Sequence, residues 1–421
     1  MRRATVVVAI FALVTAGGFT RASAAPGELD PFFSRDGIQT AFPNGAVADA
    51  VEIDHHGRIV VAGYTLADHP DIAIARFTAS GTLDTAFGDG GKVITDLGAN
   101  DYAFDLAILD DGGIVVVGER QAAATDRVVV QRYRPNGTLD PNFGDGGTIL
   151  AGFGRRFQSA NAVAIAPGGR IVVAGYTSNG STSRSAVSRY LTDGRLDRSF
   201  GQDGRVTTDV SPSAEQFTDV VVQPDGRIVA AGWAELSLVP AFDAVRYTAS
   251  GERDPTFHDD GIVRVDVSPG ADKALGLALQ RDGKLVLVGA AAAGERNEWG
   301  LVRLGPHGRL DPTFGTAGTV VTDFGPGYDE ADAVAVQGNG KLVVAGRIGP
   351  GTKDDIGIMR FRPGGGHDRT FGAGGRVLTD VAGGSDAARD LAIASNGKIV
   401  VVGEAAIDRI RRFVVARYRA A

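Results

Sequence analysis

At residues 162–175 the sequence reads Ala-Val-Ala-Ile-Ala-Pro-Gly-Gly-Arg-Ile-Val-Val-Ala-Gly, two short apolar runs on either side of a glycine-containing turn. Equivalent turns elsewhere in the chain are Asp225-Gly226, Asp282-Gly283, Asn339-Gly340 and Asn396-Gly397. These residue pairs accept the positive φ of a tight turn between two strands. Each such stretch therefore predicts a β-hairpin.

The hairpin belongs to a repeat that runs through the chain. A Leu-Asp-x-x-Phe-like motif recurs with its aspartate at Asp30, Asp84, Asp140, Asp197, Asp254, Asp311 and Asp368. The spacing is 57 residues from the third copy onward. A third strand, such as 128–133, and a fourth, such as 204–208, complete each unit. The repeat therefore predicts seven units of four short antiparallel strands.

Four-stranded units repeated four to eight times are typical of propeller blades. The chain begins with a fourth-type strand at 37–42 and ends with a third-type strand at 413–418. Pairing these two strands would complete the last blade and remove two exposed sheet edges. We predict an all-β, seven-bladed β-propeller, closed into a ring by the N-terminal strand joining the C-terminal blade.

These motifs resemble the delta-60 repeat, a bacterial β-propeller repeat with the pattern Leu-Asp-x-x-Phe-Gly, a valine-rich hairpin turning on Asp-Gly, and Arg-Tyr. The hairpin is also similar to that of NHL-type propeller repeats. The resemblance covers residues 28–419 and implies a propeller fold and export. It implies no general reaction or ligand.

The N-terminus is typical of an exported protein. Arg2 and Arg3 precede an apolar run, and Ala22-Ser23-Ala24 is a small-residue cleavage site. We predict a signal peptide at 1–24 and one seven-repeat domain at 25–421, secreted to the medium or the cell envelope. No later segment is long and apolar enough to span a membrane.

The amino-acid composition limits the classes of partner that the protein could bind. The chain has 43 basic and 50 acidic residues, a net charge of −7, and so has no basic surface for nucleic acid. There is no cysteine, which excludes disulfides and thiolate metal sites. We expect a monomer that binds an extracellular peptide, glycan or protein.

A recurring arginine precedes the aromatic residue of the third strand. It occurs at Arg76, Arg132, Arg189, Arg246, Arg303, Arg360 and Arg417, and in the first six copies an aspartate follows eight residues later. A ring of anion-binding arginines is one interpretation. The sequence favours the other, in which each blade pairs its own buried charge.

A second recurring position opens the innermost strand and should lie near one mouth of the central channel. It carries Asp49, Asp105, Asn161, Asp219, Gly276, Ala333 and Asp390. The carboxylates and the amide could together hold Ca²⁺, which takes oxygen ligands. The alternative is that each aspartate accepts hydrogen bonds from nearby backbone amides, and we expect no cofactor on this second interpretation.

The loops expected on one face carry acidic residues and aromatic side chains. The acidic residues are Asp101, Glu215, Asp272, Asp329, Glu330, Asp332, Asp354, Asp355 and Asp386. The aromatic residues are Tyr64, Tyr102, Tyr176, Trp233, Trp299 and Tyr328. Trp233, Trp299 and Tyr328 are candidate ligand contacts, and ordinary solvated loop charge is the alternative.

Signatures of catalysis are absent from the sequence: it has no Gly-x-Ser-x-Gly, His-Glu-x-x-His or phosphate-binding loop. The sequence therefore favours a secreted, non-enzymatic binding module. Two alternatives remain open. One is an extracellular propeller lyase or hydrolase that uses Asp49, Asp105, Asp219 and Asp390 as acid and base; the other is a structural cell-surface component.

Overall fold

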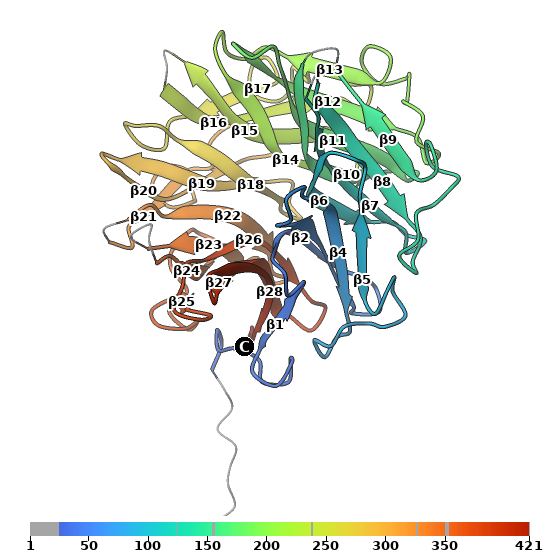
Figure 1. The fold of residues 1–421 in the computed structure, drawn as a ribbon. Coiled ribbons are helices and arrows are strands. Elements are labelled where there is room, and N and C mark those ends of the chain that lie inside the picture. The colour runs from blue at the N-terminus through green and yellow to red at the C-terminus, as the bar shows by residue number, and fades with distance from the viewer. Residues whose placement is uncertain are drawn as a thin grey trace, which may run out of the picture.

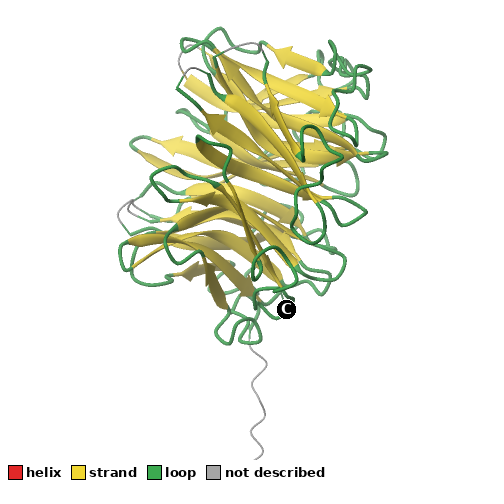
Figure 2. Cartoon of the chain, turned by 45° about the vertical axis from the view of Figure 1, so that its right-hand side comes forward, coloured by secondary structure: helices red, strands yellow, loops and turns green. Residues whose placement is uncertain are grey.

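The computed structural model describes residues 25–123, 125–153, 156–236, 239–325, 327–349 and 353–420. These residues form seven four-stranded antiparallel sheets arranged around one axis (Figure 1). The predicted seven-bladed all-β propeller is confirmed. In the described ranges the chain forms only strands, turns and loops (Figure 2), so none of it is a helix that could cross a membrane. The predicted signal peptide, 1–24, lies outside these ranges.

Six blades follow the chain order from the axis outward. Blade 1 is β2 (Ala46–Ile53), β3 (Ile59–Thr65), β4 (Ile72–Phe77) and β5 (Lys92–Thr95); blade 2 is β6 (Asn100–Ile108), β7 (Ile114–Gln121), β8 (Arg127–Tyr133) and β9 (Thr148–Ala151); blade 3 is β10 (Phe157–Ala166), β11 (Arg170–Ser178), β12 (Ser183–Tyr190) and β13 (Arg205–Thr208). Blade 4 is β14 (Glu215–Val222), β15 (Ile228–Leu236), β16 (Val239–Tyr247) and β17 (Ile262–Val265); blade 5 is β18 (Lys273–Leu279), β19 (Leu285–Ala293), β20 (Arg296–Leu304) and β21 (Thr319–Thr322); blade 6 is β22 (Glu330–Val336), β23 (Leu342–Ile348), β24 (Asp355–Phe361) and β25 (Arg376–Thr379).

The seventh blade is built from both ends of the chain. It contains β26 (Asp386–Ile393), β27 (Ile399–Ile407), β28 (Ile410–Tyr418) and, as its outer strand, β1 (Ile38–Ala41). β1 lies antiparallel to β28, with Ile38 opposite Ala416 and Ala41 opposite Phe413 (Figure 1). The predicted ring closure is therefore confirmed.

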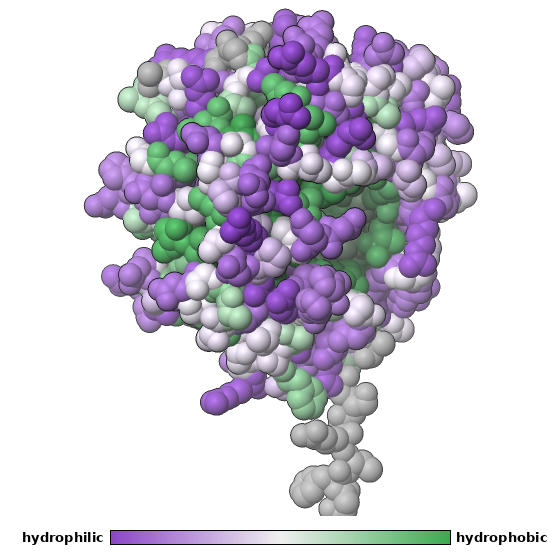
Figure 3. All heavy atoms as spheres, turned by 90° about the vertical axis from the view of Figure 1, so that its right-hand side faces the viewer, coloured by the Kyte–Doolittle hydropathy of each residue, from purple (hydrophilic) through white to green (hydrophobic). Residues whose placement is uncertain are grey.

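The hydrophobic core is divided among the seven interfaces between neighbouring blades. Between blades 1 and 2, for example, Val60 and Ile74 pack with Leu106 and Val116. The second and third strands are buried on both faces, which explains their continuous apolar runs. Hydrophilic side chains cover most of the outer edge of the ring, and apolar side chains lie mainly in its recesses (Figure 3).

The recurring arginine connects each blade to the next. In blade 4 the Nε of Arg246 donates to Asp254 Oδ2 at 2.8 Å, and Nη1 donates to the Pro306 carbonyl of blade 5 at 2.6 Å. Across the seam, Arg417 pairs with Asp30 at 2.9 Å and donates to the Ala79 carbonyl. The seventh arginine thus finds its aspartate at the other end of the chain. These contacts support the structural interpretation of the arginines.

Candidate functional site

Each innermost strand contains a β-bulge at the same point of its pairing with the second strand. In blade 2, Ala103 and Asp105 face the consecutive residues Gly118 and Val117, so Phe104 is the extra residue. The seven extra residues are Asp49, Phe104, Asn161, Thr218, Leu275, Asp332 and Arg389. All seven line a cavity at the centre of the ring.

The bulge explains a glycine that recurs near the end of every second strand. A Cβ on Gly118 would come within 1.9 Å of the Tyr102 carbonyl oxygen. The corresponding distances in the other blades are 1.9 to 2.1 Å, at Gly63, Gly175, Gly232, Gly289, Gly346 and Gly403. No larger residue fits so close to a neighbouring backbone.

The central cavity has a volume of about 300 Å³ and is predominantly acidic. Its lining includes six carboxyl groups and one guanidinium group: Asp49, Glu52, Asp105, Asp219, Asp332, Asp390 and Arg389. Asn161, Thr218 and apolar residues of the same strands supply the rest. Such a concave polar site at the axis is a candidate for ligand binding.

The candidate residues predicted to open the innermost strands occupy two different, consecutive positions of those strands. Asp49 and Asn161 are bulge residues, whereas Asp105, Asp219 and Asp390 are the residues that follow the bulge. The sequence position was counted back from the turn glycine, by seven residues in most copies. In the first copy the count was eight, and in the third it started from the first of two consecutive glycines, so Asp49 and Asn161 lie one residue earlier than the others. Counting instead from the first residue of the second strand would have found Phe104, Asp332 and Arg389.

Asp105, Asp219 and Asp390 connect neighbouring innermost strands. Each accepts one hydrogen bond from the next residue of its own strand and one from the backbone of the next blade. The bonds join Asp105 to Leu106 and Val163 (both 2.7 Å), Asp219 to Val220 and Leu277 (both 2.6 Å), and Asp390 to Leu391 and Val51 (both 2.7 Å). This is the backbone-binding role that the sequence offered as the alternative to a cation site.

Together the three aspartates accept hydrogen bonds from six of the seven innermost strands, because each accepts one from its own strand and one from the next. An odd number of blades leaves one strand over, which is β22 of blade 6, where Ala333 occupies the position. Beside it, Asp332 and Arg389 interrupt the pattern. The chemically irregular part of the axis is therefore at blades 6, 7 and 1.

Burial raises the pKa of the aspartates at the axis. The pKa of Asp219 rises to about 7 and that of Asp390 to about 8, although the backbone hydrogen bonds oppose the shift. The pKa of Asp105 rises well above its ordinary value through burial and the nearby Asp219. Asp219 and Asp390 therefore change protonation state near neutral pH.

Arg389 interacts electrostatically with Asp49 and Asp332, two carboxyl groups that accept no hydrogen bond from a donor in the described ranges. Its Nη1 is 3.8 Å from Asp332 Oδ1, and its Nη2 donates to Glu404 at 3.0 Å. Asp49 and Asp332 each have a buried oxygen without a hydrogen-bond partner. Burial raises the pKa of both to about 7, and Arg389 partly offsets this effect.

Aromatic side chains form the wall next to this group. Tyr64 of β3 meets Tyr102 of β6 edge to face, with ring centroids 4.8 Å apart, and Tyr102 stacks on Phe104 at 6.0 Å. All three rings are half-buried. Burial raises the pKa of Tyr64 to about 12, and the charge of Asp49 adds to the shift. The aromatic wall and Asp49 therefore belong to one site.

The predicted acidic loop face is largely wrong. Asp101, Glu215, Asp272 and Asp386 are fully buried at the starts of the innermost strands. Each accepts hydrogen bonds from the backbone of the preceding loop; Asp101 accepts from Leu97 at 2.6 Å, for example. They fix the loops between blades, so a polar residue recurs there for a structural reason.

The three aromatic candidates lie in different surroundings. Trp233 is half-buried on β15, with the ammonium of Lys273 4.5 Å from its ring centroid. Trp299 has no exposed surface and packs on Phe324 in the core, which removes it from ligand contact in this conformation. Tyr328 is 52% exposed on the loop before β22.

Among the residues that the structure describes, two equivalent groups of aspartates could approach a metal ion. The carboxylates of Asp71, Asp96 and Asp101 can place one oxygen each within 4.8 Å of the others, and so can those of Asp355, Asp380 and Asp386. Both groups lie between neighbouring blades, away from the axial cavity. In the corresponding place between blades 3 and 4, Arg184 pairs with Asp209 at 2.6 Å.

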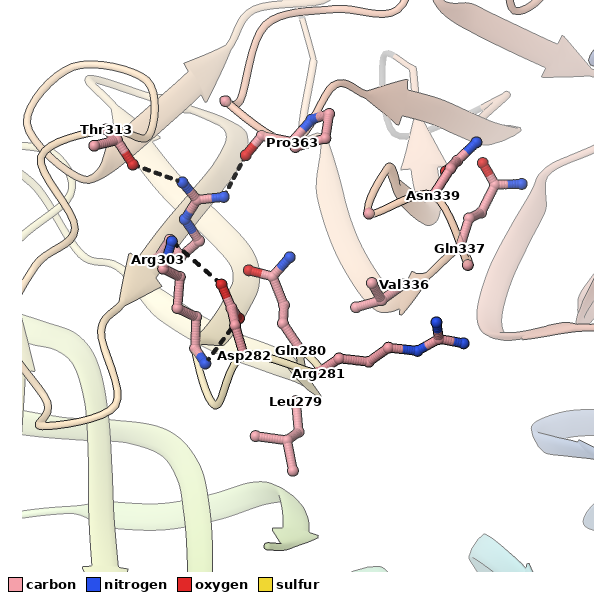
Figure 4. Close-up of a pocket in the computed structure, with 14 residues that line it drawn as sticks. Leu279, Gln280, Arg281, Asp282, Arg303, Thr313, Val336, Gln337, Asn339 and Pro363 are labelled. Atoms are coloured by element: carbon pink, nitrogen blue, oxygen red, sulfur yellow. Dashed lines mark hydrogen bonds and ion pairs between the residues drawn. The ribbon is translucent and has the colours of Figure 1, made fainter. Parts of the chain in front are cut away.

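A larger pocket, of about 650 Å³, lies between the hairpin turns of blades 5 and 6. On one side Arg303 contacts Thr313 and the Pro363 carbonyl, and Gln280, Gln337 and Asn339 lie across from it (Figure 4). Arg303 is engaged in its blade-to-blade contacts. A smaller pocket with the same position lies between blades 2 and 3, so this groove is a feature of the repeat.

Six segments of the chain match the family model described as a domain of unknown function (DUF5122) beta-propeller. The segments are residues 57–87, 109–143, 167–200, 223–257, 280–314 and 394–420. The chain contains DUF5122 β-propeller repeats. Five of the six matched segments span a hairpin turn and the Asp-x-x-Phe motif. The sixth, 394–420, spans a hairpin turn and Arg417, whose aspartate is Asp30.

Solved structures share the fold at low sequence identity. Drosophila Semaphorin 2a matches with a TM-score of 0.53 and 7% identity, over 94% of this chain and 76% of that one. The polysaccharide lyase Uly1 matches with a TM-score of 0.51 and 11% identity, over 90% of both chains. Staphylococcus aureus virginiamycin B lyase matches at 0.50 and 12%, over 90% and 98%. The curated proteins searched contain no match. These likenesses show the fold alone.

Proposed function

We propose that the protein is an exported, non-enzymatic binding module whose ligand, an extracellular peptide, glycan or protein, binds at the central cavity. The observation that carries the proposal is that the half-buried ring of Phe104 and carboxyl groups without a hydrogen-bond donor in the described ranges line the same cavity, with Tyr102 and Tyr64 next to Phe104. Elsewhere on the ring the charged residues that recur are used in blade contacts. The predicted signal peptide supports export.

We also infer that the repeats are of the delta-60 type, with the protein acting as a monomer. The seven Leu-Asp-x-x-Phe-like motifs and the Asp-Gly hairpins support the first inference. Closure of the ring leaves no unpaired terminal strand that would need a second copy, which supports the second.

The proposal is tested by thermal unfolding of the purified protein in the presence of a panel of peptides and glycans. A ligand that binds the folded state raises the unfolding midpoint by mass action. Variants Phe104→Ala and Tyr64→Ala should lose this shift, whereas Tyr328→Ala, an exposed aromatic away from the cavity, should keep it. An undiminished shift in the Phe104 and Tyr64 variants would refute the site.

A propeller lyase or hydrolase is the second candidate. It is favoured by Asp49 and Asp332, because carboxyl groups whose pKa is raised to about 7 can donate and accept protons near neutral pH. Asp105, Asp219 and Asp390, the other carboxyl groups in this hypothesis, are engaged with the backbone. Incubation with extracellular polysaccharides, followed by assay for new reducing ends or unsaturated sugars, distinguishes the two functions; product formation that Asp49→Asn and Asp332→Asn abolish would favour the enzyme.

A further inference from the structure

We propose that the central cavity takes the ammonium group of a lysine side chain, presented by a peptide or protein partner. This inference rests on the proposed function and names the ligand chemistry of the same site. It draws on the charge of the cavity, the bonding state of its carboxyl groups and the shape of its wall.

The cavity lining has more carboxyl groups than cationic groups. Among the described residues of the lining, Arg389 is the only one with a guanidinium group, against six with carboxyl groups, and it already donates to Glu404 at 3.0 Å. Two nearby arginines are paired as well: Arg347 with Glu330 at 2.7 Å and Arg411 with Glu404 at 3.3 Å. Carboxyl groups therefore outnumber cationic groups in the lining, and a cationic ligand would favour the ionised, negatively charged form of these carboxyl groups.

The carboxyl groups of the cavity differ in their hydrogen bonds. Asp105, Asp219 and Asp390 each accept two backbone N–H groups, but neither Asp49 nor Asp332 accepts a hydrogen bond within the described ranges. Leaving a buried carboxyl group without a donor is costly. An ammonium group has three N–H donors and no acceptor, so it suits carboxyl groups such as Asp49 and Asp332 that lack a hydrogen-bond donor. Asp332 faces the Arg389 guanidinium at 3.8 Å, which is beyond hydrogen-bond range.

The wall of the cavity is partly aromatic. Phe104 lines the cavity, and Tyr102 and Tyr64 extend the aromatic surface away from it. An aromatic surface attracts a nearby cation and also packs against an alkyl chain. In blade 5 of this same protein, Lys273 already lies over the ring of Trp233 at 4.5 Å.

The size of the cavity favours the lysine of a peptide over an amino sugar. The cavity of about 300 Å³ is at the small end for ligand sites and lies on the axis between seven strands. A lysine carries its ammonium at the end of a flexible four-carbon chain, which can enter a narrow site alone. An amino sugar carries its amine directly on the ring, so the ring would have to enter too. The geometry favours lysine.

The test is calorimetric titration of the purified protein with the peptide acetyl-Ser-Ala-Lys-Ala-Ser-amide and with the same peptide acetylated on the lysine Nε. We expect the first to bind and the second not to bind. Asp49→Asn should weaken binding at least about ten-fold, since a hydrogen bond to a charged group is lost. Asp332→Asn is a second, independent variant with the same expectation.

The matched control is Asp68→Asn, which makes the same charge change at an exposed loop residue outside the cavity lining. Circular dichroism checks that every variant is folded. Equal binding of both peptides, unchanged affinity in Asp49→Asn and Asp332→Asn, or equal weakening in Asp68→Asn would overturn the inference. So would tighter binding of a glucosamine tetramer, or Ca²⁺ binding that requires Asp49 while the lysine peptide fails to bind.

Failure of this inference is distinguishable from failure of the proposed function. If the lysine peptide does not bind but another ligand from the panel still requires Phe104 and Tyr64, the cavity remains the site and its ligand is not a lysine. If no ligand depends on Phe104 or Tyr64, the site itself is refuted.

Discussion

Replacing Arg417 by methionine should destabilise the protein far more than replacing an exposed arginine. The Arg417 and Asp30 side chains are only 8% and 1% exposed, and two guanidinium nitrogens lie 2.8 and 2.9 Å from Asp30 Oδ2. The guanidinium carbon also lies 4.7 Å from the Phe33 ring centroid. Breaking a buried pair from one side costs about 3–5 kcal/mol. Lys398, at 2.8 Å from Asp30, still offsets part of the buried charge, so we expect about 3 kcal/mol.

The control pair is Arg195 and Asp193, at a similar distance of 2.7 Å but 77% and 45% exposed. Arg195→Met should cost less than about 1 kcal/mol, as exposed ion pairs do. Urea denaturation of Arg417→Met, Asp30→Asn and the double variant measures the coupling between the two residues. A cost below about 1 kcal/mol for Arg417→Met, or one equal to that of Arg195→Met, would refute the reasoning.

Three further predictions concern the bulge, the axis and export. Gly118→Ala should lower the free energy of unfolding by about 3 kcal/mol in urea denaturation, because the new Cβ would overlap the Tyr102 carbonyl. In the control Gly338→Ala the new Cβ meets nothing within 4 Å, so the free energy of unfolding should hardly change. Equal effects of the two substitutions would contradict the bulge argument. Burial raises the pKa of Asp219 to about 7 and that of Asp390 to about 8, so above pH 4 the folded state binds more protons than the unfolded chain does. These two groups therefore contribute stability at low pH that is lost as the pH rises from about 4 to 8. Asp390→Asn should flatten the decline in the free energy of unfolding between pH 5 and 8, and an unchanged slope would show that Asp390 is not a source of it. Mass spectrometry of the exported protein should find Ala25 at its N-terminus; retention of residues 1–24 would contradict the predicted signal peptide.

The fold could be predicted from sequence because each blade solves the same packing problem. The Asp-x-x-Phe motif, the hairpin glycine and the arginine recur in step, and every copy carries independent evidence for the same unit. Closure followed from the strand types at the two ends of the chain. The pairing of Arg417 with Asp30 completes the same pattern across the seam, although they lie at opposite ends of the sequence.

The candidate site was harder to predict because it depends on the differences between blades. A single extra residue in each innermost strand decides whether a side chain lines the cavity or binds the neighbouring backbone, and turn-based counting misplaced that residue in some copies. Asp332 was therefore assigned to a loop, and Arg389 and Phe104 were not identified. The sequence predicts Asp101 and Glu215 as surface charges, because it does not show that backbone amides of the preceding loop donate to them.

The account depends most on the pairing of β1 with β28, since an open ring would have no axial cavity. Thr40 and Val414 lie directly opposite each other in that pairing, and the protein has no cysteine of its own. Oxidised Thr40→Cys/Val414→Cys protein should therefore form one intramolecular disulfide, seen as a loss of two mass units and of free thiol, because facing residues of paired strands meet the geometry of the bond. In the control Thr40→Cys/Val415→Cys, adjacent residues of β28 point to opposite faces, so the thiols should stay free. Free thiols in the first variant, or cross-linked dimers in place of the intramolecular bond, would contradict the closed ring.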